Sequence, residues 1–171
     1  MRGELFEQLI LELLSTAAAR WPKCLLHFED FGNSTAFHLL QNHRKSFCVF
    51  NDDIQGTAAV AVAGMISAVR ARGVSLRDDT FVFVGAGEAG CGIAELLVQL
   101  LVEEGLTETD ARGRVRLFDS KGVLCSERQN LVAHKALFCG HSRGSISEGP
   151  FCAKHIHEIK PSVLIGVCAQ V

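Results

Sequence analysis

One glycine-rich turn constrains the fold of this chain more than any other segment. Gly85, Gly87 and Gly90 follow an apolar run over residues 80–84 and precede a long apolar segment that extends to about residue 104. In such a strand–turn–helix context the glycines permit a tight turn, let the backbone approach a pyrophosphate, and allow close helix–strand packing. The first N–H groups of the helix would bind the anion. The alternative is a purely structural glycine turn.

The loop that we predict to bind a dinucleotide comprises Gly85, Ala86, Gly87, Glu88, Ala89 and Gly90. Asp119 ends the next predicted strand, where an acidic residue commonly binds the ribose hydroxyls of the cofactor. It lies further along the chain than the usual offset of about 20 residues. We attribute the extra length to a loop that we expect over residues 105–113.

Segments with strand and helix patterns alternate along the chain. Apolar spacing and helix propensity predict helices over 4–19, 35–43, 58–70 and from the glycine turn to about 104. Short apolar runs predict strands over 24–28, 47–50, 80–84, 115–118 and 162–167. Residues 125–154 give no clear pattern. The alternation predicts an α/β fold, a Rossmann-like parallel sheet with flanking helices that is truncated at both ends.

Composition narrows the classes of partner. Hydrophobic residues make up 48% of the 171, enough for a packed core. Seventeen basic residues against nineteen acidic ones leave a net charge of −2, so we expect small-molecule partners and no nucleic acid. No uninterrupted apolar run approaches the roughly 18 residues of a membrane span, so we expect no membrane association.

Cysteine and histidine usage suggests an intracellular protein without a zinc site. The seven cysteines are scattered and form no C-x-x-C pair, so we expect reduced thiols. His155 and His157 are expected to be a surface pair rather than metal ligands. The opening segment has the features of neither a secretory signal nor a transit peptide, and cytoplasm, mitochondrion and plastid are not distinguished.

Two successive predicted strands each end in a pair of acidic residues, Glu29-Asp30 and Asp52-Asp53. In an open parallel sheet, ligands bind beyond the carboxyl ends of the strands. Four carboxylates gathered there would repel one another, and a hard cation such as Mg²⁺ or Mn²⁺ would compensate. The alternative is that these acids are helix caps and loop residues on solvated turns.

Three segments, in this order and spacing, resemble the signature blocks of malic enzymes. They are Phe28-Glu-Asp-Phe-Gly-Asn33, Phe50-Asn-Asp-Asp-Ile-Gln-Gly-Thr-Ala-Ala-Val60 and Phe83-Val-Gly-Ala-Gly-Glu-Ala-Gly90. The resemblance covers nearly the whole chain and is poorest over 124–157. It implies that residues 1–70 are the C-terminal part of a metal- and substrate-binding domain. Residues 71–171 would then be the N-terminal part of an NAD(P)-binding Rossmann domain.

Malic enzymes oxidatively decarboxylate L-malate to pyruvate and CO₂, reduce NAD⁺ or NADP⁺, and require Mg²⁺ or Mn²⁺. By resemblance, Glu29, Asp30 and Asp53 match the three metal-ligating acids, and Asp52 matches the acid beside them that supports the catalytic lysine. The implied cofactor contacts are the glycine turn, Asp119, Ser120 and Lys135. Ser120 with Lys121 and Lys135 favours NADP, whereas Asp119 favours NAD by the general rule.

The chain departs from the family pattern in two ways. No counterpart of the family's tyrosine acid and lysine base precedes Glu29, and the chain contains no tyrosine. It stops at Val171, before the asparagines that hold malate and nicotinamide. We therefore expect a malic enzyme fragment that is inactive in isolation, with a homo-oligomeric full-length form.

Two alternatives to an enzyme fragment remain at this point. The first is a non-catalytic nucleotide-binding or subunit-interaction module derived from the malic enzyme family, which the missing tyrosine and lysine favour. The second is another dehydrogenase with a glycine-rich loop, such as an amino-acid dehydrogenase. Residues 51–57, Asn-Asp-Asp-Ile-Gln-Gly-Thr, count against the second.

Overall fold

The computed structural model describes residues 3–140 and 142–168, and the chain divides into two compact units, Met1–Asp52 and Asp53–Val171. We expected a boundary after residue 70, but the units divide after Asp52. The reason is that helix α3, Thr57–Arg72, packs against helix α4, Glu88–Glu103, which belongs to the second unit. Each unit is described by itself.

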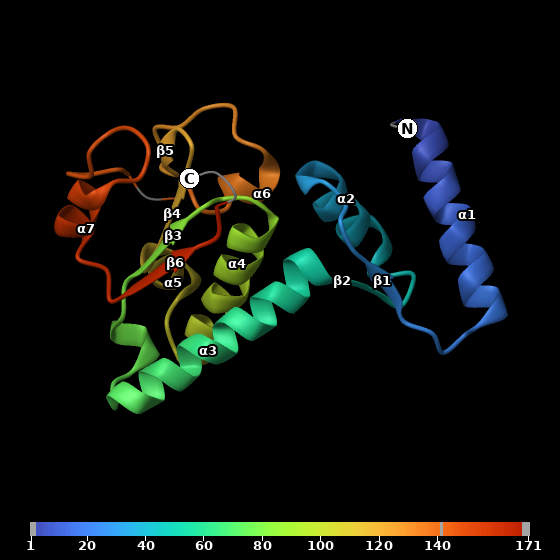
Figure 1. Ribbon diagram of the computed structural model, residues 1–171, viewed down its shortest axis with the longest axis horizontal. Helices are drawn as coiled ribbons and strands as arrows, with labels where there is room; N and C mark the ends of the chain where they lie inside the picture. The colour runs from blue at the N-terminus through green and yellow to red at the C-terminus, as the bar shows by residue number, and fades with distance from the viewer. Residues whose placement is uncertain (1–2, 141, 169–171) are drawn as a thin grey trace. The chain divides into compact units, whose positions relative to one another are not determined.

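The first unit is a two-stranded parallel sheet with two helices (Figure 1). Its elements are α1 (Glu4–Arg20), β1 (Leu26–Phe28), α2 (Asn33–His43) and β2 (Val49–Asn51). Ile10 and Leu14 of α1 bury one face of that helix against Phe28 and Leu39. The helices and strands predicted over residues 4–50 are therefore confirmed, and the row of apolar residues through Ile10 and Leu14 is the buried face of α1.

The second unit contains a four-stranded sheet in the order β5-β4-β3-β6. Strands β3 (Phe81–Val84), β4 (Val115–Asp119) and β6 (Val163–Gly166) are parallel, and the two-residue β5 (Gly122–Val123) is antiparallel to β4. Helix α4 lies on one side of the sheet and α7 (Ala153–Ile159) on the other (Figure 1). The α/β fold with a mainly parallel sheet is confirmed.

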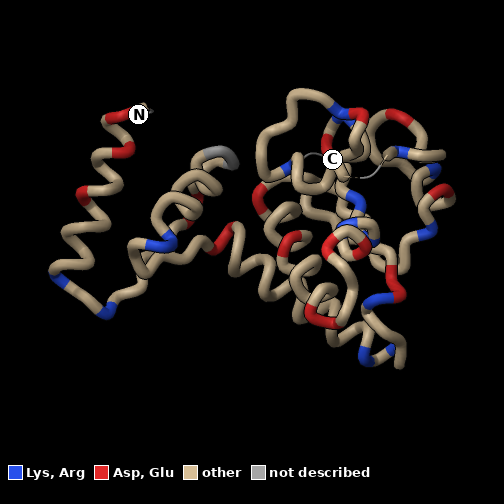
Figure 2. Tube along the Cα trace, turned by 180° about the vertical axis from the view of Figure 1, so that it is seen from behind, with Lys and Arg blue, Asp and Glu red and all other residues tan. Residues whose placement is uncertain are grey.

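Strand alternation gives this sheet two buried faces. Phe81 and Phe83 of β3 point to one side and are fully buried, whereas Val82 packs with Phe118 on the other side. Phe151 and Ile159 cover that second side. Both faces are apolar, as expected for a parallel sheet enclosed between helices. Acidic and basic residues are interspersed along the second unit (Figure 2).

The helical stretch Asp52–Arg72 has the length and composition of a membrane span. It starts with a π-helical turn (Asp52–Gly56) and continues as α3, and its 21 residues include an 18-residue window with a mean hydropathy of 1.3. The sequence prediction required an uninterrupted apolar run, and by that requirement it gave no membrane span. In the second unit α3 buries Ala58, Val62, Met65 and Val69 and packs along α4.

The loop predicted over residues 105–113 was wrong, because helix α5 (Glu108–Gly113) occupies most of it. The Thr107 hydroxyl accepts a hydrogen bond from the Asp110 N–H at 3.1 Å, which caps the start of the helix. Residues 125–154, which show no clear sequence pattern, contain a short helix, α6 (Ala133–Ala136). A 3₁₀ turn at Leu76–Asp78 precedes β3. Polar composition concealed α5, because its one buried residue is Ala111.

The prediction that two histidines form a surface pair is correct for His157 and wrong for His155. His157 is exposed, but His155 is 1% exposed and stacks on Phe151. The Cys152 N–H donates to His155 Nδ1 at 3.0 Å, so Nε2 carries the proton and donates to the Ser147 carbonyl at 3.2 Å. His155 is thus a core residue with both nitrogens satisfied. All seven cysteines are free.

Candidate functional site

The glycine turn joins β3 to α4 at the carboxyl end of the sheet. Gly85 has a φ of 120°, and a Cβ there would lie 2.6 Å from the Val167 carbonyl oxygen. A Cβ on Gly90 would lie 2.0 Å from the Gly85 carbonyl oxygen. Both distances exclude any side chain. Backbone atoms therefore pack closely against both glycines. A dinucleotide-binding turn and a purely structural turn would both require this packing.

The start of α4 offers backbone donors to a ligand. Gly87 is its N-cap, and within residues 3–140 and 142–168 no side chain caps the helix. Glu88 lies in the first turn, and its buried Oε1 has no hydrogen-bond partner in that part of the chain. Burial, with a smaller contribution from Asp53, raises the pKa of Glu88. The N–H groups of this helix end suit a pyrophosphate.

Asp119 ends β4, next to the glycine turn, and its carboxylate is surrounded by cations. Arg128 donates from Nη1 to Oδ1 at 3.2 Å and from Nη2 to Oδ2 at 3.0 Å. Lys135 Nζ lies 3.3 Å from Oδ2, and the Lys121 N–H donates to Oδ1 at 2.9 Å. Burial alone would raise the pKa of Asp119, but these hydrogen bonds outweigh it and hold the pKa below its usual value.

The structure therefore brings together Asp119 and Lys135, two of the residues expected to contact the cofactor, and adds Arg128. Sequence reasoning missed Arg128 because it lies in an irregular segment. The only signal was its place nine residues beyond the strand-ending acid. Ser120 and Lys121 are exposed at the turn between β4 and β5. A cavity of about 590 Å³ opens beside this cluster, with Lys121, Arg128 and Arg143 in its lining.

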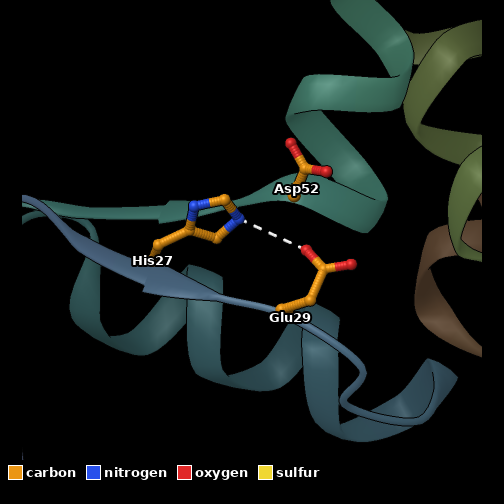
Figure 3. Close-up of side chains that lie close together, drawn as sticks. All are labelled: His27, Glu29 and Asp52. Carbon is orange, nitrogen blue, oxygen red and sulfur yellow. Dashed lines mark hydrogen bonds and ion pairs between the residues drawn. The ribbon is translucent and has the colours of Figure 1, made fainter.

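In the first unit, the acids after β1 and β2 lie close together for a reason visible in the strand register. Phe28 pairs with Asn51, so the chain places Glu29 and Asp52 directly beyond paired residues. His27, Glu29 and Asp52 each offer one potential ligand atom, and these atoms all lie within 4.8 Å of one another (Figure 3). His27 Nε2 lies 3.3 Å from Glu29 Oε2.

His27 is a residue that sequence reasoning missed, because a lone histidine on a short strand carries no spacing signal. Asp30, next to Glu29, is exposed and has a φ of 57°, a left-handed conformation that aspartate tolerates better than most residues. Two carboxylates with this separation match the oxygen ligands that Mg²⁺ and Mn²⁺ prefer. Asp53 belongs to the second unit, so its convergence with Glu29 and Asp30 stays a prediction.

A parallel α/β sheet whose first glycine-rich turn opens a helix, with an acid at the end of the next strand, defines a dinucleotide-binding domain of the Rossmann class. The family model of the malic enzyme NAD binding domain matches residues 54–171, and that of the malic enzyme N-terminal domain matches residues 1–44. The chain belongs to the malic enzyme family.

Relatives with curated names agree with this assignment. An NADP-dependent malic enzyme of Anas platyrhynchos is 43% identical over 99% of this chain, and an NAD-dependent malic enzyme of Acinetobacter baylyi is 42% identical over 98% of it. The chain spans 30% and 31% of the lengths of these two proteins.

Solved structures show the same fold. The malic enzyme of Entamoeba histolytica superimposes with a TM-score of 0.75 at 23% identity, over 95% of this chain and 32% of that structure. The malic enzyme of Pyrococcus horikoshii gives a TM-score of 0.68 at 25% identity, over 94% of this chain and 37% of that structure.

Proposed function

We propose that the whole protein catalyses the oxidative decarboxylation of L-malate to pyruvate and CO₂, with reduction of NAD(P)⁺. The observation that carries the proposal is the pairing of a side-chain-excluding glycine turn with the cation-ringed Asp119 at the ends of adjacent strands. This pairing occurs in a chain of the malic enzyme family. Relatives that match it are named NAD- or NADP-dependent malic enzymes.

We propose Glu29, Asp30 and Asp53 as ligands of Mg²⁺ or Mn²⁺, with Asp52 as the acid beside them. When bound, such a cation supplies Lewis-acid stabilisation of negative charge on the substrate oxygens. The chain's own contribution is to hold carboxylates at the ends of two paired strands, where rigid backbone fixes their spacing. Asp52 and the exposed His27 lie beside Glu29 and can orient it.

The cofactor side of the proposal assigns roles within the second unit. The backbone N–H groups of Glu88, Ala89 and Gly90 would bind the pyrophosphate, and Gly85, Ala86 and Gly87 let it approach. Asp119 would face the adenosine ribose. Because Arg128 and Lys135 already neutralise Asp119, a 2′-phosphate would meet net positive charge there rather than a bare carboxylate. We therefore propose NADP⁺ as the preferred cofactor.

The proposal extends to the context of the protein. We propose an intracellular homo-oligomer that takes L-malate as its substrate and releases pyruvate. A similar mouse protein is named a mitochondrial NADP-dependent malic enzyme. A second candidate function is a non-catalytic nucleotide-binding or subunit-interaction module. The observation that favours it is that the second unit by itself contains both the glycine turn and the Asp119 cluster.

A segment exchange tests the enzymatic proposal directly. This chain would replace the matching segment of the Anas platyrhynchos enzyme, and malate-dependent NADPH formation would be followed with Mn²⁺ present. We expect turnover that Asp53→Asn reduces by at least about 10²-fold, the scale of one lost catalytic group. A folded exchange protein that binds NADP⁺ but shows no turnover would instead support the binding-module function.

Cofactor choice is tested by calorimetric titration of NADP⁺ and NAD⁺ into this chain and into Lys135→Ala. Wild type should bind NADP⁺ roughly tenfold or more tightly than NAD⁺, since one charge-assisted hydrogen bond contributes about 1.5–3 kcal/mol. Lys135→Ala should lose most of that difference. Equal affinity of wild type for the two cofactors would contradict the NADP⁺ preference while leaving nucleotide binding intact.

A further inference from the structure

Arg112 on α5 connects three elements around the Asp119 cluster. Its Nη1 and Nη2 atoms donate to the two carboxylate oxygens of Glu95 on α4, at 3.1 and 3.2 Å. Its Nε donates to Glu108 at 3.0 Å. Only 15% of the Arg112 side chain is exposed, so this paired guanidinium is fixed rather than mobile on the surface.

The same guanidinium also contacts the segment that carries Lys135. Nη1 donates to the Leu137 carbonyl oxygen at 3.4 Å, and the guanidinium carbon lies 5.4 Å from the centre of the Phe138 ring. Phe138 is 6% exposed and lies two residues after the end of α6. The Arg112 contacts therefore begin two residues after Lys135.

Helix α6 has four residues, far fewer than a helix needs to be stable by itself. Its position must come from contacts to neighbouring elements. Lys135 on α6 reaches Asp119 at 3.3 Å, and its flexible stem makes that distance sensitive to where α6 lies. Arg112 therefore links the end of α6 to α4, the helix that follows the glycine turn.

We propose that Arg112 is a positioning residue for cofactor selectivity, which fixes α6 on α4 so that the Lys135 ammonium lies beside Asp119. The inference rests on the proposed nucleotide function of the glycine turn and Asp119. Arg112 does not touch the cofactor in this arrangement. Its effect is transmitted through the Leu137 carbonyl and the Phe138 ring, and it acts on the adenosine 2′ position only.

The test is a double-mutant cycle read as the ratio of NADP⁺ to NAD⁺ affinity. Calorimetry would compare the wild-type chain with Arg112→Met, Lys135→Met and the double variant. We expect Arg112→Met to lower the ratio about fivefold or more and Lys135→Met to lower it at least as much. The double variant should match Lys135→Met, because residues that act through one another are non-additive. A loss of folding alone would lower both affinities and leave the ratio unchanged.

Arg72→Met is the matched control. Arg72 also makes two hydrogen bonds to one carboxylate, to Asp79 at 3.0 and 2.9 Å, but its partner lies before β3. Arg72→Met should leave the ratio of NADP⁺ to NAD⁺ affinity unchanged. If Arg112→Met folds poorly, Glu95→Gln removes the charge of the residue that pairs with the same guanidinium on α4, with a smaller perturbation, and should lower the ratio in the same direction.

An unchanged ratio in both Arg112→Met and Glu95→Gln would overturn the inference, as would additive effects in the double variant. The same change in Arg72→Met would also overturn it, because the effect would then be general. If wild type bound neither nucleotide, the proposed function itself would fail. Binding of both nucleotides by wild type with no effect of Arg112→Met or Glu95→Gln would remove this inference alone.

Discussion

Arg128 holds the carboxylate of Asp119 through both of its Nη atoms, which lie 3.2 Å from Oδ1 and 3.0 Å from Oδ2. This two-point contact fixes the plane of the carboxylate at the end of β4. It also explains why the pKa of Asp119 is low although the group is partly buried. Arg128 thereby stabilises the second unit and sets the charge at the ribose end of the proposed cofactor site.

We expect Arg128→Met to destabilise the second unit by about 1–3 kcal/mol at pH 7, because it leaves a partly buried carboxylate with fewer donors. The pH dependence follows from the low pKa of Asp119. A lowered folded pKa gives stability that is present above the unfolded value and is lost as pH falls through the folded value. In the variant that pKa rises, so Asp119 protonates at a higher pH than in wild type, and the deficit should shrink as pH falls below 3.8 toward the folded pKa of the wild-type group.

Urea unfolding at pH 7 and at about pH 3 measures this difference. Arg70→Met is the control, since Arg70 is exposed near the end of α3. It should change the free energy of unfolding by a few tenths of a kcal/mol at both pH values. A deficit for Arg128→Met that stays constant with pH would show that the guanidinium acts by packing and not through Asp119.

Two glycine-to-alanine substitutions should have opposite effects. Gly90→Ala places a Cβ 2.0 Å from the Gly85 carbonyl oxygen, so the turn must open. We expect a loss of several kcal/mol and of nucleotide binding, as for an overpacked site. Gly64 lies on the exposed side of α3 with no atom within 4 Å of its Cβ position. Gly64→Ala should stabilise by up to about 1 kcal/mol through helix propensity.

Thermal unfolding of the two variants measures the contrast. Equal stability of Gly90→Ala and wild type would mean that the turn can adapt. The close packing of α4 on the glycine turn would then not be a requirement of the fold.

Helix α5 gives a third test, because its start depends on one hydroxyl. Thr107 accepts the Asp110 N–H at 3.1 Å and donates to the Asp110 carboxylate at 2.7 Å. Thr107→Ala should cost about 1 kcal/mol, whereas Thr107→Ser should be close to wild type because it keeps the hydroxyl. Urea unfolding compares the three proteins. Similar losses for both substitutions would indicate that the threonine methyl group, and not the cap, matters.

The sequence predicted those elements whose apolar pattern coincides with burial. In α1, Ile10, Leu14 and Ala17 recur at helical spacing and are the residues that the helix buries. In β3 a short apolar run reflects burial on both faces. The glycine turn was predictable because steric exclusion allows no other residue at Gly85 or Gly90. Pattern and physics agree at these positions.

Other features could not be predicted, because their cause lies in distant contacts. Arg128 contacts Asp119 from an irregular segment, and no local pattern indicates that contact. His155 is buried because hydrogen bonds satisfy both ring nitrogens and an aromatic ring stacks on it, although histidine is only intermediate in its tendency to be buried. Helix α5 is mostly polar, so its cap and not its periodicity identifies it. The register that aligns Glu29 with Asp52 likewise needs the fold.

The proposed metal ligands of the first unit give the last prediction. Glu29 and Asp52 each offer an oxygen within 4.8 Å of the other, next to His27. Mn²⁺ affinity depends on the number of carboxylate ligands, so Glu29→Gln should weaken Mn²⁺ binding by roughly tenfold or more. Electron paramagnetic resonance of free Mn²⁺ measures this binding.

The chain contains a matched control for Glu29 in the same unit. Glu7 also pairs with a histidine, His38, at 3.1 Å. The side chains of this pair are exposed to a degree similar to those of His27 and Glu29. Glu7→Gln removes the same charge from the same kind of pair, but Glu7 does not belong to a group of potential ligands among the described residues. It should leave Mn²⁺ affinity unchanged. Equal weakening by the two substitutions would show that Mn²⁺ responds to the overall negative charge of the unit, and Glu29 would then lose its assignment as a ligand.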